Sequence, residues 1–263
     1  MDFTLTQYTE LLKSLQHAGY FFQTFEQFIQ KPHKRGLVLR HDVDARPENS
    51  LRFARLQAEA GIGGSYYFRV VPQSYNPPII KEIASLGHEV GYHYETMDHV
   101  SSKFQVSSSR LRSEDLIEAA YEEFCSNLEM IRKIVPVETI CMHGSPRSKY
   151  DNKMIWDKYD YKSLGLIGEP YFDIDFRKVG YLTDTGRRWN GDKVSIRDKV
   201  NNPFNFNFRS TQDIINSVHQ LPNQVMFTFH PQRWNSRTLP WIKEFVWQNT
   251  KNGIKYFVIK IRD

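Results

Sequence analysis

Apolar residues recur along the chain at two spacings, one typical of strands and the other typical of helices. Short runs rich in β-branched and aromatic residues predict strands, and amphipathic stretches between them predict helices. The predicted strands cover residues 37–42, 65–71, 89–93, 139–142, 164–167, 181–183, 225–229 and 256–261. The predicted helices cover residues 47–60, 78–86, 113–134, 211–220 and 239–249. This alternation is typical of a parallel sheet built from βαβ units.

The first 35 residues precede this alternation and are predicted to form an N-terminal helical extension. Leu5, Tyr8, Leu11 and Leu15 recur there at helical spacing. No internal repeat or low-complexity segment divides the rest of the chain. We therefore expect a single domain over residues 1–263, with residues 1–35 as its extension.

About seven parallel strands can form either a doubly wound sheet or a closed barrel. A dinucleotide-binding sheet would carry Gly-x-Gly-x-x-Gly after its first strand, and the sequence after residue 42 has no such motif. The unusual polar residues instead follow several strands, where a (β/α) barrel collects its chemistry. The sequence therefore favours an α/β fold of the (β/α)-barrel type.

Composition and charge narrow the class of protein further. The net charge is +5 and the pI is about 9.0, but the basic residues are dispersed, which favours ordinary solubility or an anionic substrate over nucleic acid. No stretch approaches the roughly 20 apolar residues of a membrane span. The first residues lack the basic and apolar regions of a signal peptide, and Cys125 and Cys141 do not make a disulfide framework. We expect a cytoplasmic protein.

The first strand of the main fold ends in two acids, Asp42 and Asp44. Side chains alternate along a strand, so these carboxylates share one face, Arg40 lies on that face, and His41 points the other way. Two neighbouring carboxylates repel unless a metal binds one and a cation or proton accompanies the other. The alternative is a pair of loop or helix-capping aspartates without chemistry.

Histidines follow three more predicted strands. His93 comes with Glu95 two positions later, His143 precedes an abrupt Gly and Pro turn, and His230 is followed by Pro231. One acid and two imidazoles are a common ligand set for catalytic zinc, with an open position for water. A further carboxylate can act as a base and a free histidine as an acid. The residues thus indicate a mononuclear metal hydrolase, and the alternative is a set of structural core and rim histidines.

This set of motifs resembles the polysaccharide deacetylase, or NodB-homology, family (carbohydrate esterase family 4). The resemblance covers residues 36–232 and is clearest over residues 37–95. It implies a distorted (β/α) barrel of about seven parallel strands, in an enzyme that removes acetyl groups from N-acetylated sugars. It also implies that Asp42 is the catalytic base and that Asp44 binds the metal.

The second family motif follows a Gly-His-Glu-Val-Gly segment, matched by residues 87–91, and implies that His93 binds the metal. The family pattern is His-x-x-x-His, but the position four after His93 is Met97, a poor ligand for a borderline cation. His99 and Glu95 are two candidates for the missing ligand.

The third family motif usually begins with arginine, and here it matches residues 143–146, which begin with His143. Our hypothesis is that His143 supplies the missing ligand. The predicted metal set is then Asp44, His93 and His143, and the predicted cofactor is a divalent metal, with Zn²⁺ first among the candidates.

The last two motifs concern the acid and the substrate. The fifth implies that His230 is the general acid. The fourth includes an acid and a tryptophan, matched weakly by residues 183–189, where Asp184 is a candidate to orient either His230 or Arg187. In that segment Arg187 and Trp189 are predicted to bind the substrate through charge and ring stacking; the alternative is a surface turn.

The predicted function is a metal-dependent hydrolase that removes an amide-linked acetyl group from a carbohydrate, in glycan or surface-polysaccharide biosynthesis. The absence of a visible signal peptide favours a nucleotide-linked or lipid-linked sugar as the substrate. One alternative is a catalytically inactive barrel that binds a glycan or a protein partner, which the missing second histidine of the family motif favours. Another is a hydrolase acting on an amide that is not on a sugar.

Overall fold

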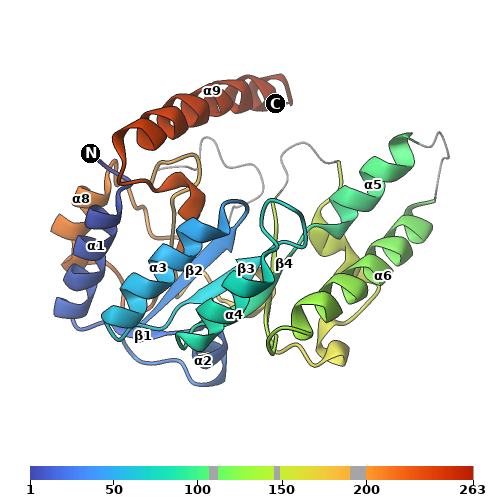
Figure 1. Cartoon of the computed structure of the whole chain (residues 1–263), viewed down its shortest axis with the longest axis horizontal. Helices are drawn as coiled ribbons and strands as arrows, with labels where there is room; N and C mark the ends of the chain where they lie inside the picture. Colours follow the sequence, from blue (N-terminus) through green and yellow to red (C-terminus); the bar gives the residue numbers. More distant parts are fainter. Residues whose placement is uncertain (107–111, 145–148, 190–199, 263) are drawn as a thin grey trace.

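A parallel sheet forms the centre of the fold in the computed structural model, which describes residues 1–106, 112–144, 149–189 and 200–262 (Figure 1). Its strands are β1 (Phe21–Gln23), β2 (Gly36–Val43), β3 (Ser65–Phe68), β4 (Glu89–Tyr94), β5 (Ile140–Met142), β6 (Gly180–Thr183) and β7 (Val225–Phe229). The strand order is β5-β4-β3-β2-β7-β6, and β1 pairs with the start of β2. Every pairing between these described strands is parallel.

The predicted α/β class and the distorted barrel of parallel strands are confirmed. Among the described strands no pairing joins β5 to β6, so the barrel is open along that side. All eight residues of β2 are buried, as expected for a central parallel strand covered on both faces. Because the strands are parallel, their carboxyl ends gather at one mouth, and β2, β4, β5 and β7 each deliver predicted site residues there.

Helices cover the sheet and connect its strands. The α-helices are α1 (Leu5–His17), α2 (Phe25–Gln30), α3 (Pro47–Glu59), α4 (Pro77–Ser85), α5 (Thr96–Val106), α6 (Ser113–Arg132), α7 (Pro170–Asp173), α8 (Thr211–Asn216) and α9 (Thr238–Arg262). The short 3₁₀ helices are η1 (Asn152–Asp157), η2 (Tyr161–Leu164), η4 (Val218–Gln220) and η5 (Pro231–Arg233). No helix within the described residues is both long and apolar enough to cross a membrane.

The N-terminal extension contains more than the expected helix. The helical spacing is confirmed, because Tyr8, Leu11 and Leu15 are buried on α1. The extension also supplies β1 and α2, and β1 pairs Phe22 with Leu37 at the start of β2. A strand of three residues is too short to show a period of two, so the sequence pattern did not reveal it.

The predicted last strand, over residues 256–261, is wrong. The helix that begins at Thr238 continues through Arg262. A short apolar run rich in β-branched and aromatic residues does not distinguish a strand from the end of a helix by periodicity. The helix continues through Gly253, a residue that costs only about 1 kcal/mol inside a helix.

Two further expectations need correction. The predicted strand over residues 164–167 is wrong, because η2 ends at Leu164 and the neighbouring contact is a single bridge between Thr139 and Gly168. Helix α5 was not expected. It begins directly after the site residues of β4, where polar residues interrupt the apolar spacing that predicts a helix.

Candidate metal centre

Strand β2 brings Arg40 and Asp42 together on its inner face. The Arg40 Nε donates to Asp42 Oδ1 at 2.8 Å and its Nη2 donates to Oδ2 at 2.7 Å, with both side chains buried. Burial alone would raise the pKa of Asp42, but the charges of Arg40 and then of His93 outweigh it and hold that pKa well below its ordinary range. Asp42 is therefore an ionised carboxylate at neutral pH, in agreement with the sequence expectation for Arg40.

His41 lies on the opposite face of β2, as the alternation predicts. Its Nε2 is 3.1 Å from the Tyr8 hydroxyl and 3.2 Å from the Gln57 amide, and its Nδ1 is 3.1 Å from the Ser65 carbonyl. Burial lowers the pKa of His41 to about 3, so the imidazole is neutral. This histidine belongs to the core and takes no part in the site.

Asp44, His93 and His143 converge at the carboxyl ends of β2, β4 and β5. The Asp44 Oδ1 lies 3.5 Å from His93 Nε2 and 3.6 Å from His143 Nε2. One potential ligand atom from each side chain fits within 4.8 Å of the others. The Asp44 Oδ2 accepts a hydrogen bond from Gln232 Nε2 at 2.9 Å, whereas the buried Oδ1 has no hydrogen-bond partner. The free oxygen thus faces the two imidazole nitrogens.

Each of the two histidines has a neighbour on the side of its ring away from Asp44. The His93 Nδ1 is 3.0 Å from the carbonyl of Cys141, which can only accept, so Nδ1 carries the proton and the Nε2 lone pair faces Asp44. The His143 Nδ1 is 3.1 Å from a Glu95 carboxylate oxygen, an ion-pair distance without a hydrogen bond among the described residues. Outer-shell acceptors of this kind orient metal-binding histidines.

Glu95 is itself held in place. The Arg69 guanidinium donates to both of its oxygens, from Nη2, at 2.7 and 2.6 Å. Burial acts to raise the pKa of Glu95, but His143 and Arg69 outweigh it and lower that pKa. Glu95 is therefore an ionised carboxylate beside the His143 ring.

These residues fit a divalent metal. Three lone-pair atoms, one of them a buried oxygen without a partner, repel one another unless a cation lies between them. Two imidazole nitrogens and one carboxylate oxygen make up a common catalytic zinc set. Asp44, His93 and His143 are the residues that would hold the metal.

A second group of potential ligands consists of Asp42, His93 and Cys141. The Arg40 guanidinium already occupies both oxygens of Asp42, so a cation there would compete with a buried arginine. The group that contains Asp44 is therefore the better candidate.

The two reserve candidates lie elsewhere or act differently. His99 is on α5, where its Nδ1 lies 2.6 Å from Glu123 at the surface, away from the three converging side chains. Glu95 contacts His143 on the side opposite the Asp44 oxygen, through Nδ1. Met97, at the position of the missing family histidine, is fully buried in the core.

His230 and Asp184 form a tightly bonded pair beside this centre. The His230 Nδ1 lies 2.5 Å from Asp184 Oδ1, and the buried Asp184 also accepts from Trp234 Nε1 at 2.6 Å. Burial opposes ionisation of Asp184, but the charge and hydrogen bonds of His230, with Arg233 after them, lower its pKa. His230 contributes to lowering the pKa of both Asp42 and Asp44, which places it within electrostatic reach of the two acids.

The predicted substrate platform needs correction. Trp189 is only 3% exposed, and its ring packs against Phe3, Trp234 and Phe229 in the core. The prediction that Trp189 stacks on a sugar is therefore wrong for this structure. A single tryptophan near a polar turn does not distinguish a core residue from a ligand platform.

Arg187 is buried and joins α9 to the barrel. Its backbone is left-handed, with φ of 59°, and its guanidinium lies 4.3 Å from the centre of the Trp241 ring. Its Nη1 donates to the Trp241 carbonyl at 3.2 Å, whereas its Nε and Nη2 have no hydrogen-bond partner among the described residues. Its contact with a substrate stays a prediction.

Gln232 and Tyr171 were not predicted. Gln232 holds one oxygen of Asp44, and the Tyr171 hydroxyl accepts from Arg40 Nη2 at 3.3 Å. No motif marks either residue. The position of Gln232 directly after the His230 and Pro231 turn is the one signal in the sequence that points to the mouth.

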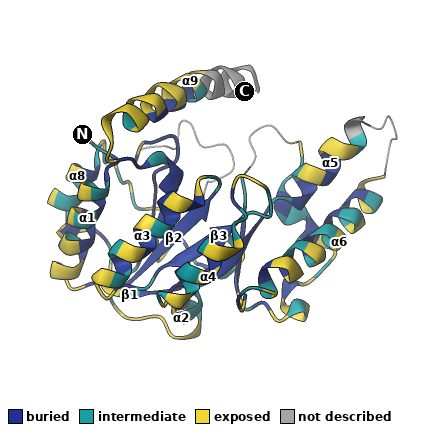
Figure 2. Ribbon diagram, in the orientation of Figure 1, coloured by how far each residue is buried: buried dark blue, intermediate teal, exposed yellow. Residues whose placement is uncertain are grey.

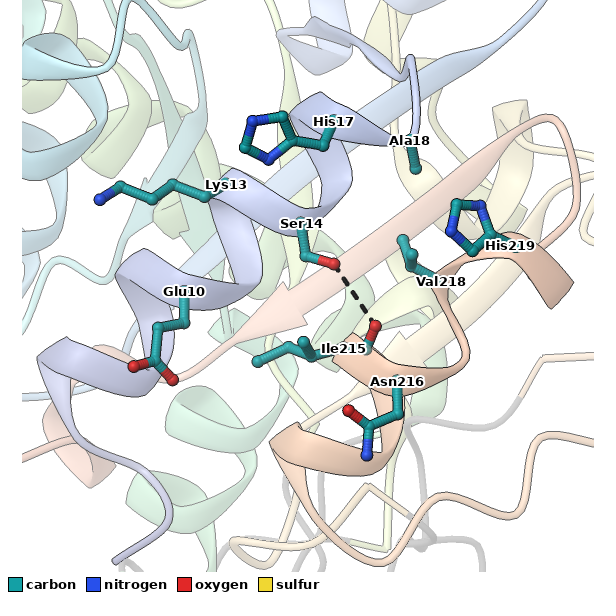
Figure 3. A pocket seen from close by; sticks show the side chains of 9 residues that line it. All are labelled: Glu10, Lys13, Ser14, His17, Ala18, Ile215, Asn216, Val218 and His219. Atoms are coloured by element: carbon teal, nitrogen blue, oxygen red, sulfur yellow. Dashed lines mark hydrogen bonds between the residues drawn. The ribbon is translucent and has the colours of Figure 1, made fainter.

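A surface groove of about 390 Å³ lies between α1 and the segment around α8 (Figure 3). It is lined by Glu10, Lys13, Ser14, His17, Ala18, Ile215, Asn216, Val218 and His219. Figure 3 shows the Ser14 hydroxyl bonded to the Ile215 carbonyl across it, at 3.4 Å. None of the strand-end residues lines this groove.

Comparison with known proteins yields distant structural matches. No protein-family model matches the sequence, and no curated protein matches it. Three of the solved structures similar to this chain belong to carbohydrate esterase family 4, two of them esterases and one a pseudoenzyme. This is the family that the sequence motifs resemble.

The first is an esterase from Bacillus anthracis, 9% identical, which covers 93% of this chain and 86% of that chain with a TM-score of 0.41. The second, from Streptomyces lividans in complex with acetate, is 15% identical and covers 82% and 88% with a TM-score of 0.42. The third is a family 4 pseudoenzyme from Bacillus anthracis, 12% identical, covering 84% and 62% with a TM-score of 0.40. The likeness is distant, and the chemistry of the site follows from the side chains of this chain.

Proposed function

We propose that this protein is a metal-dependent hydrolase that removes an amide-linked acetyl group from a carbohydrate. One observation carries the proposal. The buried, unpartnered Oδ1 of Asp44 faces the Nε2 atoms of His93 and His143; the Nδ1 of His93 is bound to the Cys141 carbonyl, and the Nδ1 of His143 lies 3.1 Å from the Glu95 carboxylate. This arrangement supports a metal-binding site with an ionised base and a histidine acid beside it.

Asp44, His93 and His143 hold the metal in this proposal, with zinc as the first candidate. When bound, the metal supplies a Lewis acid that polarises a carbonyl and lowers the pKa of water. Gln232 fixes the orientation of Asp44 by donating to the other carboxylate oxygen. The remaining steps belong to residues of the chain itself.

Asp42 is the base in this proposal. Its Oδ2 lies 3.8 Å from His93 Nε2, so the carboxylate borders the position of the metal. Arg40 keeps Asp42 ionised and fixes the plane of its carboxylate through two hydrogen bonds. Asp42 accepts the proton of the attacking water as the new C–O bond to the amide carbonyl forms.

His230 is the acid in this proposal. Asp184 binds its Nδ1, which leaves Nε2 to donate a proton to the leaving nitrogen as the C–N bond breaks. The buried Asp184 carboxylate also stabilises the protonated ring before the transfer. A base on β2 and an acid after β7 thus act on two sides of one amide.

The substrate class rests on the sequence resemblance to the deacetylase family. An acetylated amino sugar provides the amide that this base and acid pair requires. A nucleotide-linked or lipid-linked sugar, in glycan or surface-polysaccharide biosynthesis, remains our proposal for the form in which it is presented. The net charge of +5 favours an anionic carrier of this kind.

Release of acetate from a panel of N-acetyl sugars tests the proposal. The protein is stripped of metal with a chelator and then reloaded with zinc, and acetate is measured in both states. We expect release only after reloading. Zinc-loaded protein that binds a sugar of the panel without releasing acetate would instead support an inactive glycan-binding barrel. Hydrolysis of non-sugar amides alone would remove the carbohydrate from the proposal.

A further inference from the structure

Helix α9 is amphipathic in the reverse of the usual sense, because its polar side faces the protein. Glu244, Gln248 and Asn252 are buried on this inner side. The Glu244 carboxylate accepts from Arg46 Nη1 at 3.1 Å, and the Asn252 amide donates to the Gly186 carbonyl at 2.8 Å. These contacts fix which side of the helix faces water.

The outward side of the first half of α9 carries exposed apolar side chains, beside exposed polar residues such as Lys243 and Asn249. Leu239, Ile242 and Val246 are 80%, 46% and 58% exposed, and Trp247 is 56% exposed. The first three recur at helical spacing and form one stripe, with Trp247 at its border; we call these four residues the outer stripe. Figure 2 shows exposed residues over most of the described part of α9. Exposed apolar side chains gathered on one helix mark an interaction surface.

The charge of α9 indicates what this surface meets. The helix sequence has one acid, Glu244, and five basic residues, Lys243, Lys251, Lys255, Lys260 and Arg262. Lys243 is exposed beside the outer stripe, and the Lys251 ammonium lies 4.9 Å from the centre of the Trp247 ring. Apolar stripes bordered by lysine and tryptophan are typical of helices that lie in the interface of an anionic membrane.

A second copy of the chain fits this surface less well. A two-fold interface would place one α9 against the other, so the basic helices would repel. A stable interface also takes about 800 Å² from each partner and some 20–30 residues a side, whereas the outer stripe has four residues on one helix. An anionic lipid surface both neutralises the lysines and buries the apolar side chains of the outer stripe.

We propose that α9 lays its outer stripe on the surface of a membrane that contains anionic phospholipids. In Figure 1, α9 lies at the end of the molecule toward which β2 points. Its contact with Arg46, two residues after Asp44, fixes it to the mouth of the barrel. Docking therefore brings the candidate metal centre close to the lipid headgroups. The docking itself does not depend on the proposed hydrolase activity. That docking brings the site to a lipid-linked substrate does rest on the proposed function.

Vesicle cosedimentation of the full chain tests the proposal. We expect binding to phosphatidylcholine vesicles that contain phosphatidylglycerol, release by high salt, and no binding to phosphatidylcholine alone. The double variant Ile242→Gln with Val246→Gln should lower the partition constant at least roughly tenfold, because two apolar side chains no longer leave water. The matched control Asn249→Gln, at an exposed polar position of α9, should bind like the parent chain.

Equal binding of the double variant and the parent chain would overturn the proposal, as would binding that ignores lipid charge. A third outcome is that the parent chain forms a dimer, the double variant does not, and neither binds vesicles. This would assign the outer stripe to contact between two copies and would also overturn the proposal. Circular dichroism and zinc content of each variant confirm that the fold is retained. Failure of acetate release leaves the vesicle result unchanged, so the two proposals are tested separately.

Discussion

The two faces of β2 both bury polar side chains, but they satisfy them differently. On the outer face, His41 bonds through both ring nitrogens to Tyr8, Gln57 and Ser65. On the side of the inner face, directly after the end of β2, one oxygen of Asp44 is buried and has no hydrogen-bond partner. A closed polar network stabilises and orients a core, whereas an open one requires a ligand. The predictions below test this difference, starting with the largest expected effect.

Asp42→Asn should abolish most of the activity while metal remains bound. An amide cannot accept the proton from water, and general-base catalysis typically contributes about 10²–10⁴-fold. The rate of acetate release and the zinc content of the same sample measure the two effects. Loss of zinc together with activity, in a variant that remains folded, would show that Asp42 is a metal ligand rather than the base.

The same substitution leaves Arg40 buried without a carboxylate. Breaking a buried pair in this way costs about 3–5 kcal/mol, so the free energy of unfolding should also fall. Asp175→Asn, which loses a surface pair with Arg177, is the matched control and should leave the free energy of unfolding nearly unchanged.

Glu95→Gln should weaken zinc binding about 10–100-fold, the usual cost of losing an outer-shell acceptor. The ionised carboxylate 3.1 Å from His143 Nδ1 becomes neutral, so the ring is a weaker donor to the metal. Competition with a chromophoric chelator measures the affinity. Glu123→Gln, which neutralises the carboxylate beside the surface residue His99, should leave the affinity for zinc unchanged. Equal loss in both variants would contradict the assignment of Glu95.

His41→Gln should make the stability of the protein depend less steeply on pH. Burial lowers the folded-state pKa of His41 from 6.5 to about 3, so the unfolded chain binds its proton first as the pH falls. His41 therefore costs no stability above about pH 6.5, and the free energy of unfolding decreases from there toward pH 3 by up to about 1.4 kcal/mol per pH unit. Urea titrations at several pH values should show a shallower slope in the variant. Identical slopes would mean that His41 is not neutral in the folded protein.

The sequence predicted the parts of the site that lie on strands. Alternation along β2 placed Arg40 and Asp42 on one face and His41 on the other, because a strand has a fixed period. It also indicated that His93, His143 and His230 follow strands whose carboxyl ends meet at one mouth. These inferences needed only local geometry and a parallel sheet.

The sequence did not predict what depends on packing between distant segments. Trp189 and Arg187 follow β6 and were expected at the surface, but Phe3 and Trp241, far away in the sequence, bury them. Gln232 reaches Asp44 across 188 positions of the chain. The end of α9 resembles a strand in composition and is a helix, because an apolar run of that length fits either structure.

The zinc content of His143→Ala tests the account's central claim most directly. His99→Ala, which removes a surface histidine paired with Glu123, is the matched control. After equilibration with limiting free zinc, we expect close to one zinc per chain in the parent protein and in His99→Ala, and a large loss of zinc in His143→Ala. Full occupancy in His143→Ala, or loss in His99→Ala instead, would contradict a centre formed by Asp44, His93 and His143.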